Sequence, residues 1–189
     1  MPTGVQIAAA LYGAWRLLRM DRNGLSYFEQ TPEGFYRSFY AALLVAPGYL
    51  ILVLIHLADL ETQAGGLRII TVEIIAYVIS WTAYPLIMFR IADAIGRSSG
   101  YITFVVAFNW SKMIHMLIFL PIAAISFTGL LPEALSLLLS FAATIGILVY
   151  QWFITRTALD IGGGAATGLV VLDVIIGIVI KFISDGLIT

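Results

Sequence analysis

Five long apolar runs separated by short polar segments dominate the chain. They cover roughly residues 38–58, 69–91, 101–127, 133–155 and 165–187. Each is long enough for a helix to cross a bilayer, which takes about 20 residues. Hydrophobic residues make up 61% of the chain and charged residues 11%, whereas soluble domains carry about 25% charged residues. The pattern therefore predicts an all-α polytopic membrane protein, with a five-helix transmembrane bundle over residues 38–189.

The segment before the bundle, residues 1–37, has a different pattern. Residues 5–20 read as a helix too short and too basic to span a membrane, with Arg16 and Arg19 at its polar edge. Its apolar side carries Ile7, Leu11, Trp15 and Leu18. This pattern is typical of an amphipathic helix lying in the membrane interface, with Arg16, Arg19 and Trp15 contacting lipid headgroups. A helix packed on the rest of the protein is the alternative.

Prolines mark the entry to the first span and possible kinks within three spans. Thr31 before Pro32 resembles an N-cap followed by proline at the first helical position, so we expect a helix to begin at Pro32 and run into the membrane. Pro47, Pro85 and Pro121 lie inside the first, second and third spans. Each is expected to kink its helix, because proline removes one backbone hydrogen bond.

The basic residues are distributed unevenly between the two sides of the predicted bundle. Seven arginines fall on one side: Arg16, Arg19, Arg22, Arg37, Arg90, Arg97 and Arg156. Only Arg68 and Lys181 lie towards the other side. The positive-inside rule then predicts a cytoplasmic N-terminus and a C-terminus on the other side, which for a bacterial inner (cytoplasmic) membrane is the periplasm.

Ionisable and amide side chains inside the spans are the candidate chemistry. Asn109, Lys112 and His115 share one side of the third span, Glu73 lies in the second and Asp173 in the fifth. One interpretation is a proton or ion pathway, which such groups often mark. The other is a structural ion pair. Lys112 lies about 16 Å and Asp173 about 12 Å from the same end of the bundle at the usual helical rise, so these two are the preferred pair, with Glu73 as the competitor.

Small residues give the last span a possible packing surface. Gly164 and Gly168 form a GxxxG motif, and Gly177 extends the stripe of small residues. Such residues let helices approach closely in membranes. We therefore expect these three glycines to act in helix packing.

Several classes of function are not supported by the sequence. The chain has no cysteine and two histidines, which argues against disulfides, thiol catalysis and a dedicated metal site. The glycine-rich stretch 162–168 is followed by Leu169, where a nucleotide-binding P-loop needs lysine. No catalytic motif is present, and the basic residues are too scattered for nucleic-acid binding. We predict a protein that is not an enzyme and uses no cofactor.

The stretch Thr31-Pro32-Glu33-Gly34-Phe35-Tyr36-Arg37-Ser38-Phe39 leads into five closely spaced spans. In this layout the chain resembles the small Yip1-like membrane proteins of bacteria. The resemblance implies a non-enzymatic protein that organises the membrane or serves as an accessory subunit of a membrane complex, with lipids, a second copy of itself or another membrane protein as partners. The alternative is a small transporter or proton-conducting protein that uses Lys112, Asp173 and His115.

Overall fold

The computed structural model describes residues 1–58 and 64–189, and these residues are helical and contain no strand. The N-terminal segment holds α1 (Gly4–Leu18), η1 (Arg22–Tyr27) and α2 (Pro32–Ser38). The long helices are α3 (Tyr40–Ala58), α4 (Gly66–Ala94), α5 (Tyr101–Phe127), α6 (Glu133–Leu159) and α7 (Gly163–Ile188), with a short η2 (Ser98–Gly100) before α5. The all-α fold is thus confirmed.

Within the described residues, five helices are long and apolar enough to cross a membrane. The first combines α2 and α3, as the Thr31–Pro32 signal predicts: the Thr31 side chain accepts a hydrogen bond from the Gly34 amide at 3.1 Å. The fourth predicted span ends at residue 155, whereas α6 continues to Leu159 and is capped by Asp160 in the left-handed conformation. Helices end at a capping residue rather than where hydrophobicity falls, which explains the difference. Pro47, Pro85 and Pro121 lie inside α3, α4 and α5 without ending them.

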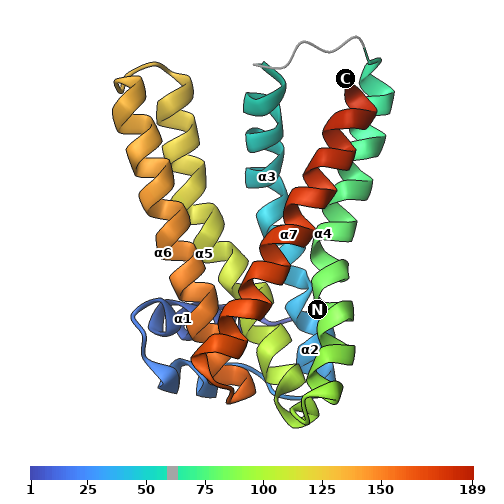
Figure 1. Ribbon diagram of the computed structural model, residues 1–189, viewed down its shortest axis with the longest axis vertical. Helices are drawn as coiled ribbons and strands as arrows, with labels where there is room; N and C mark the ends of the chain where they lie inside the picture. The colour runs from blue at the N-terminus through green and yellow to red at the C-terminus, as the bar shows by residue number, and fades with distance from the viewer. Residues whose placement is uncertain (59–63) are drawn as a thin grey trace.

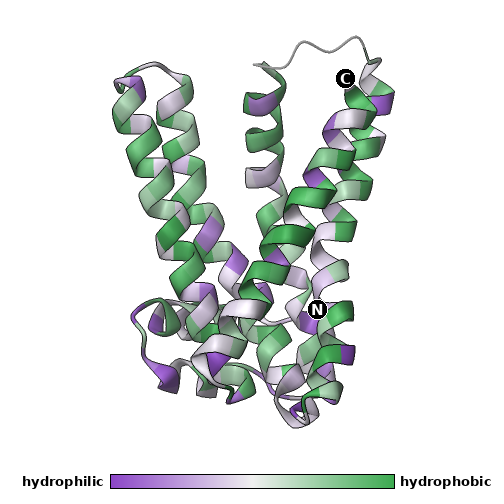
Figure 2. Cartoon of the chain, viewed as in Figure 1, coloured by the Kyte–Doolittle hydropathy of each residue, from purple (hydrophilic) through white to green (hydrophobic). Residues whose placement is uncertain are grey.

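Two groups of helices diverge from a shared, closely packed end (Figure 1). We call this end the base; it carries α1, η1, α2 and the turn between α6 and α7, and the opposite, far end carries the C-terminus. Towards the far end, α5 and α6 lean away from α3, α4 and α7. The four largest fully buried side chains, Tyr84, Tyr150, Phe104 and Phe108, lie in the base half. Apolar residues cover the outer surfaces of the long helices (Figure 2), as contact with lipid requires.

Helix α1 packs against the bundle through its smallest side chains. Ala10, Gly13, Ala14 and Leu17 are buried, and the Tyr150 hydroxyl of α6 donates a hydrogen bond to the Ala14 carbonyl at 2.8 Å. Ile7, Leu11 and Leu18 of the predicted apolar side also pack against this core, whereas Trp15 is 49% exposed. The inner face of α1 is therefore that of the alternative prediction, a helix packed on the rest of the protein. Headgroup contact by Arg19 and Trp15, which are both exposed, stays a prediction.

Arg16, the third predicted headgroup contact, forms an ion pair within the chain. Its guanidinium donates hydrogen bonds to the Asp21 carboxylate and, at 3.2 Å, to the Tyr27 hydroxyl. These hydrogen bonds raise the pKa of Arg16, and the bond from Arg16 lowers the pKa of Asp21. Arg16 therefore joins α1 to η1, and its contact with a lipid headgroup stays a prediction.

The glycines expected to pack helices do not do so within this chain. A Cβ added at Gly164, Gly168 or Gly177 would meet no atom within 4 Å. Helices instead approach closely at Gly48 of α3, where an added Cβ would lie 2.6 Å from the Met116 sulfur of α5. The α7 stripe is exposed, so it brings no two helices of this chain together.

Candidate functional site

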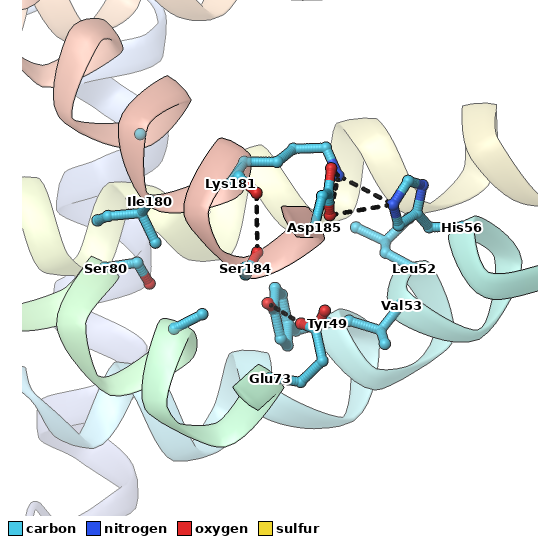
Figure 3. Close-up of a pocket in the computed structure, with 12 residues that line it drawn as sticks. Tyr49, Leu52, Val53, His56, Glu73, Ser80, Ile180, Lys181, Ser184 and Asp185 are labelled. Atoms are coloured by element: carbon cyan, nitrogen blue, oxygen red, sulfur yellow. Dashed lines mark hydrogen bonds and ion pairs between the residues drawn. The ribbon is translucent and has the colours of Figure 1, made fainter. Parts of the chain in front are cut away.

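A cavity of about 270 Å³ lies between α3, α4 and α7 in the far half of the bundle (Figure 3). Each helix lines it with residues that recur at helical spacing, so that one stripe of each faces inward. These are Tyr49, Leu52, Val53 and His56 from α3; Glu73, Ala76 and Ser80 from α4; and Gly177, Ile180, Lys181, Ser184 and Asp185 from α7. We call this space the far cavity. It collects five of the ionisable or phenolic side chains of the bundle.

Three of these side chains form a charged cluster near the far end. Lys181 Nζ lies 3.0 Å from Asp185 Oδ2 and 3.1 Å from His56 Nε2. The same Nε2 lies 3.4 Å from Asp185 Oδ1. An Nε2 that carries a proton can donate to Asp185, whereas an Nε2 without one can accept from Lys181. Whether Nε2 carries a proton thus decides whether His56 donates to Asp185 or accepts from Lys181.

Glu73 is held differently from the charged cluster. Its Oε2 accepts a hydrogen bond from the Tyr49 hydroxyl at 2.8 Å. In the part of the chain that the structure describes, Glu73 forms no ion pair. It lies seven residues inside α4, or about 10 Å from the start of that helix at 1.5 Å per residue. The carboxylate is therefore placed within a membrane-spanning helix with a single phenol as its partner.

A second cavity, of about 250 Å³, adjoins the first and contains Lys112. The two cavities share Tyr49, Leu52 and Ser80 in their linings. Lys112 Nζ donates to the Ser80 carbonyl at 3.1 Å and lies 4.3 Å from the centre of the Trp81 ring. The centre of the Phe108 ring lies 4.9 Å from the same Nζ. Cation–π contacts of this kind stabilise an ammonium group that has left water.

The turn of α4 that receives Lys112 is also the turn that Pro85 affects. Proline has no amide hydrogen, so Pro85 cannot donate to the carbonyl four residues earlier, at Trp81. The neighbouring Ser80 carbonyl is the one that Lys112 binds. Pro85 therefore leaves free the carbonyl next to the one that Lys112 binds.

His115 lines the same second cavity as Lys112. Its ring meets the Tyr150 ring edge-on at 5.8 Å between centroids. Its Nε2 is buried and has no hydrogen-bond partner within the described chain. A buried polar atom is normally satisfied, so this nitrogen is a free acceptor or donor beside the cavity.

The predicted polar cluster is therefore brought together only in part. Lys112 and His115 share one cavity, and Glu73 lines the adjoining one. Asn109 instead donates to the Ser38 hydroxyl at 2.9 Å, where both residues are fully buried. Asp173 accepts from the Gln151 amide at 3.1 Å. These two polar contacts join α5 to α2 and α7 to α6.

The preferred pairing of Lys112 with Asp173 is not formed. No ion pair joins them among the residues described, although they are close enough for a Coulombic interaction. The depth of a residue along the bundle axis does not specify the direction in which its side chain points. Lys112 points to α4 and Asp173 to α6.

Sequence reasoning missed four of the five ionisable or phenolic side chains that line the far cavity: Tyr49, His56, Lys181 and Asp185. Their spacing carried a signal, because Tyr49 and His56 are seven residues apart and Lys181 and Asp185 four apart, both on one helical face. No group of three potential metal ligands occurs in residues 1–58 and 64–189. Comparisons of the chain with protein-family models, with curated proteins and with solved structures find no match.

Proposed function

We propose that the protein is a small proton- or ion-conducting membrane protein in which the two adjoining cavities form one half of the pathway. The carrying observation is Glu73, a carboxylate inside a membrane-spanning helix whose partner among the described residues is a tyrosine hydroxyl rather than a cation. Such a group is costly in a membrane and most often marks an ion or proton route. It lies between the His56 cluster and Lys112, so ionisable groups continue from the far end to the middle of the bundle.

The direction of entry follows from the distribution of arginines. The positive-inside rule places the arginine-rich base in the cytoplasm of a bacterium and the far end in the periplasm. Protons or ions would then enter from the periplasm through the far cavity. The base half is filled by the large buried rings of Tyr84, Phe104 and Phe108. Passage to the cytoplasm therefore requires α5 and α6 to move relative to the other helices.

Proton flux into liposomes tests this function. Purified protein is reconstituted with a pH-sensitive dye inside the liposomes, and a potassium gradient with valinomycin drives proton entry. We expect flux above that of empty liposomes, and about tenfold or greater loss in Glu73→Gln, because an amide cannot take up a proton. Glu133→Gln is the matched control, since Glu133 is exposed in the first turn of α6. Flux equal to that of empty liposomes, or equal in Glu73→Gln and wild type, would contradict the proposal.

A second candidate, assembly in the membrane as the Yip1-like resemblance implies, is supported by the exposed glycines of α7. Gly164 and Gly168 serve no contact within the chain, so a helix of a second copy could pack on them. We expect Gly168→Leu to lower the dimer population about tenfold, given that bulk at such a glycine separates the helices. Gly146→Leu, at an equally open glycine of α6, is the control. Native mass spectrometry that finds wild type monomeric would argue against assembly.

A further inference from the structure

A cationic cavity lies at the base, on the side of the molecule opposite to the far cavity. It has a volume of about 430 Å³ and is lined by Arg22, Phe153, Arg156, Thr157, Asp160 and Ile161. Arg22 begins η1, whereas the other five residues come from the last turns of α6 and the residues just after it. The cavity thus joins the N-terminal segment to the bundle at the predicted membrane surface.

The charges that face this cavity are not balanced within the chain. Three other arginines at the base have carboxylate partners: Arg16 binds Asp21, Arg37 binds Glu29 at 2.9 Å and Arg97 binds Asp160 at 3.4 Å. Arg19 and Arg90 form no ion pair among the described residues and lie outside the cavity lining. The guanidiniums of Arg22 and Arg156 have no hydrogen bond or ion pair in the part of the chain described. Asp160 is the one carboxylate in the lining, and Arg97 already binds it. Two guanidiniums are therefore available to an anion.

An apolar groove begins beside the same arginine. The Arg156 guanidinium lies 5.2 Å from the centre of the Trp152 ring. Trp152 in turn lines a groove of about 380 Å³ between α6 and α7, with Val149, Val170 and Val174 further along it. The Trp152 indole donates to the Gly163 carbonyl at 3.0 Å, which fixes the ring between the two spaces. A cationic cavity thus meets an apolar groove on the surface of membrane-spanning helices.

We propose that this site binds an anionic phospholipid, with its phosphate between Arg22 and Arg156 and one acyl chain along the α6–α7 groove. Guanidinium groups bind phosphate oxygens in paired hydrogen bonds, and two of them favour a headgroup that carries no compensating cation. A water-soluble phosphate compound has no acyl chain that could contact the apolar wall of the adjoining groove. Trp152 lies where aromatic side chains favour the boundary between headgroups and hydrocarbon. The lipid would clamp the N-terminal segment to α6.

Lipid retention measured by native mass spectrometry tests the site. Protein is reconstituted in nanodiscs that hold equal amounts of phosphatidylglycerol and phosphatidylcholine, then released and measured. Wild type is expected to retain phosphatidylglycerol over phosphatidylcholine, and the Arg22→Gln/Arg156→Gln double variant to lose about tenfold of that preference, as expected when charge-assisted bonds are removed. Arg90→Gln, which removes an exposed arginine of α4 outside the cavity lining, is expected to keep it. Equal preference in wild type and the double variant, or equal loss in Arg90→Gln, would overturn the proposal.

Two further measurements keep the test decisive. Soluble glycerol phosphate is added in competition; if it displaced the lipid at equal concentration, the ligand would be a free phosphate compound and the lipid assignment would be wrong. Should the double variant fail to fold by circular dichroism, fluorescence quenching decides instead. Brominated phosphatidylglycerol is expected to quench wild type more than Trp152→Phe, whereas equal quenching of both would place no lipid at the groove.

Discussion

Replacing Lys112 with methionine is expected to abolish proton flux while leaving the protein folded and as stable as wild type. The flux depends on Lys112 because it is the ionisable group that continues the route inward from the far cavity. The stability of the fold does not depend on Lys112 in the same way, because its ammonium contacts a carbonyl and two aromatic rings rather than a carboxylate. Replacing a whole buried ion pair by apolar residues is often neutral or stabilises by about 1–4 kcal/mol, and the cost of removing one charge comes from the partner left unpaired. Lys112→Met leaves no ion-paired carboxylate behind among the described residues.

The opposite result would restore the structural interpretation of Lys112. Removing one partner of a buried ion pair costs about 3–5 kcal/mol, since the other charge is left unpaired. A loss of that size in Lys112→Met, measured by thermal unfolding in mild detergent, would mean that Asp173 and Lys112 do pair in the membrane. Leu117→Met is the control for methionine in α5, because Leu117 is 64% exposed on the outer surface. It should change neither flux nor stability.

The five spans could be predicted because each is a long apolar run bounded by polar residues. The third span, predicted over residues 101–127, coincides with α5. Span ends were less accurate where a cap lies beyond the apolar run, as at Asp160 after α6. The face that α1 buries was predicted in part, since Ile7, Leu11 and Leu18 pack against the core. The closest contact is made by Ala10, Gly13 and Ala14, which hydrophobic periodicity does not rank highly because they are small.

The candidate site was only partly predictable for a geometric reason. Position in a span gives the depth of a residue, whereas its direction around the helix depends on how the helices are rotated against one another. Lys112 and Glu73 were recognised because charges inside long apolar runs stand out. His56 and Asp185 lie two and three residues from the ends of α3 and α7, where charges are expected at any membrane surface. Only the contact between their side chains at the far cavity shows that they face each other.

Replacing Gly13 with alanine is expected to destabilise the protein by about 1–3 kcal/mol, the usual cost of overpacking a close contact. On helix propensity alone the change should stabilise α1 by about 0.5–1 kcal/mol, because glycine weakens helix interiors. The contact reverses the sign: an added Cβ would lie 2.8 Å from the Gly24 carbonyl oxygen and 3.0 Å from Tyr27 Cβ. Gly24 is itself buried against α1, so its backbone cannot move aside without separating η1 from the helix.

Gly146→Ala measures the effect of helix propensity alone, without the close contact found at Gly13. Gly146 lies within α6, and an added Cβ there would meet no atom within 4 Å. The propensity gain is then unopposed, so Gly146→Ala should raise the thermal midpoint where Gly13→Ala lowers it. If both variants were stabilised, α1 would not be docked on η1 through these glycines, and it would lie free in the membrane interface. Because Arg22 reaches the cationic cavity from η1, Gly13→Ala should also weaken phosphatidylglycerol retention, which links the docking of α1 to the lipid site.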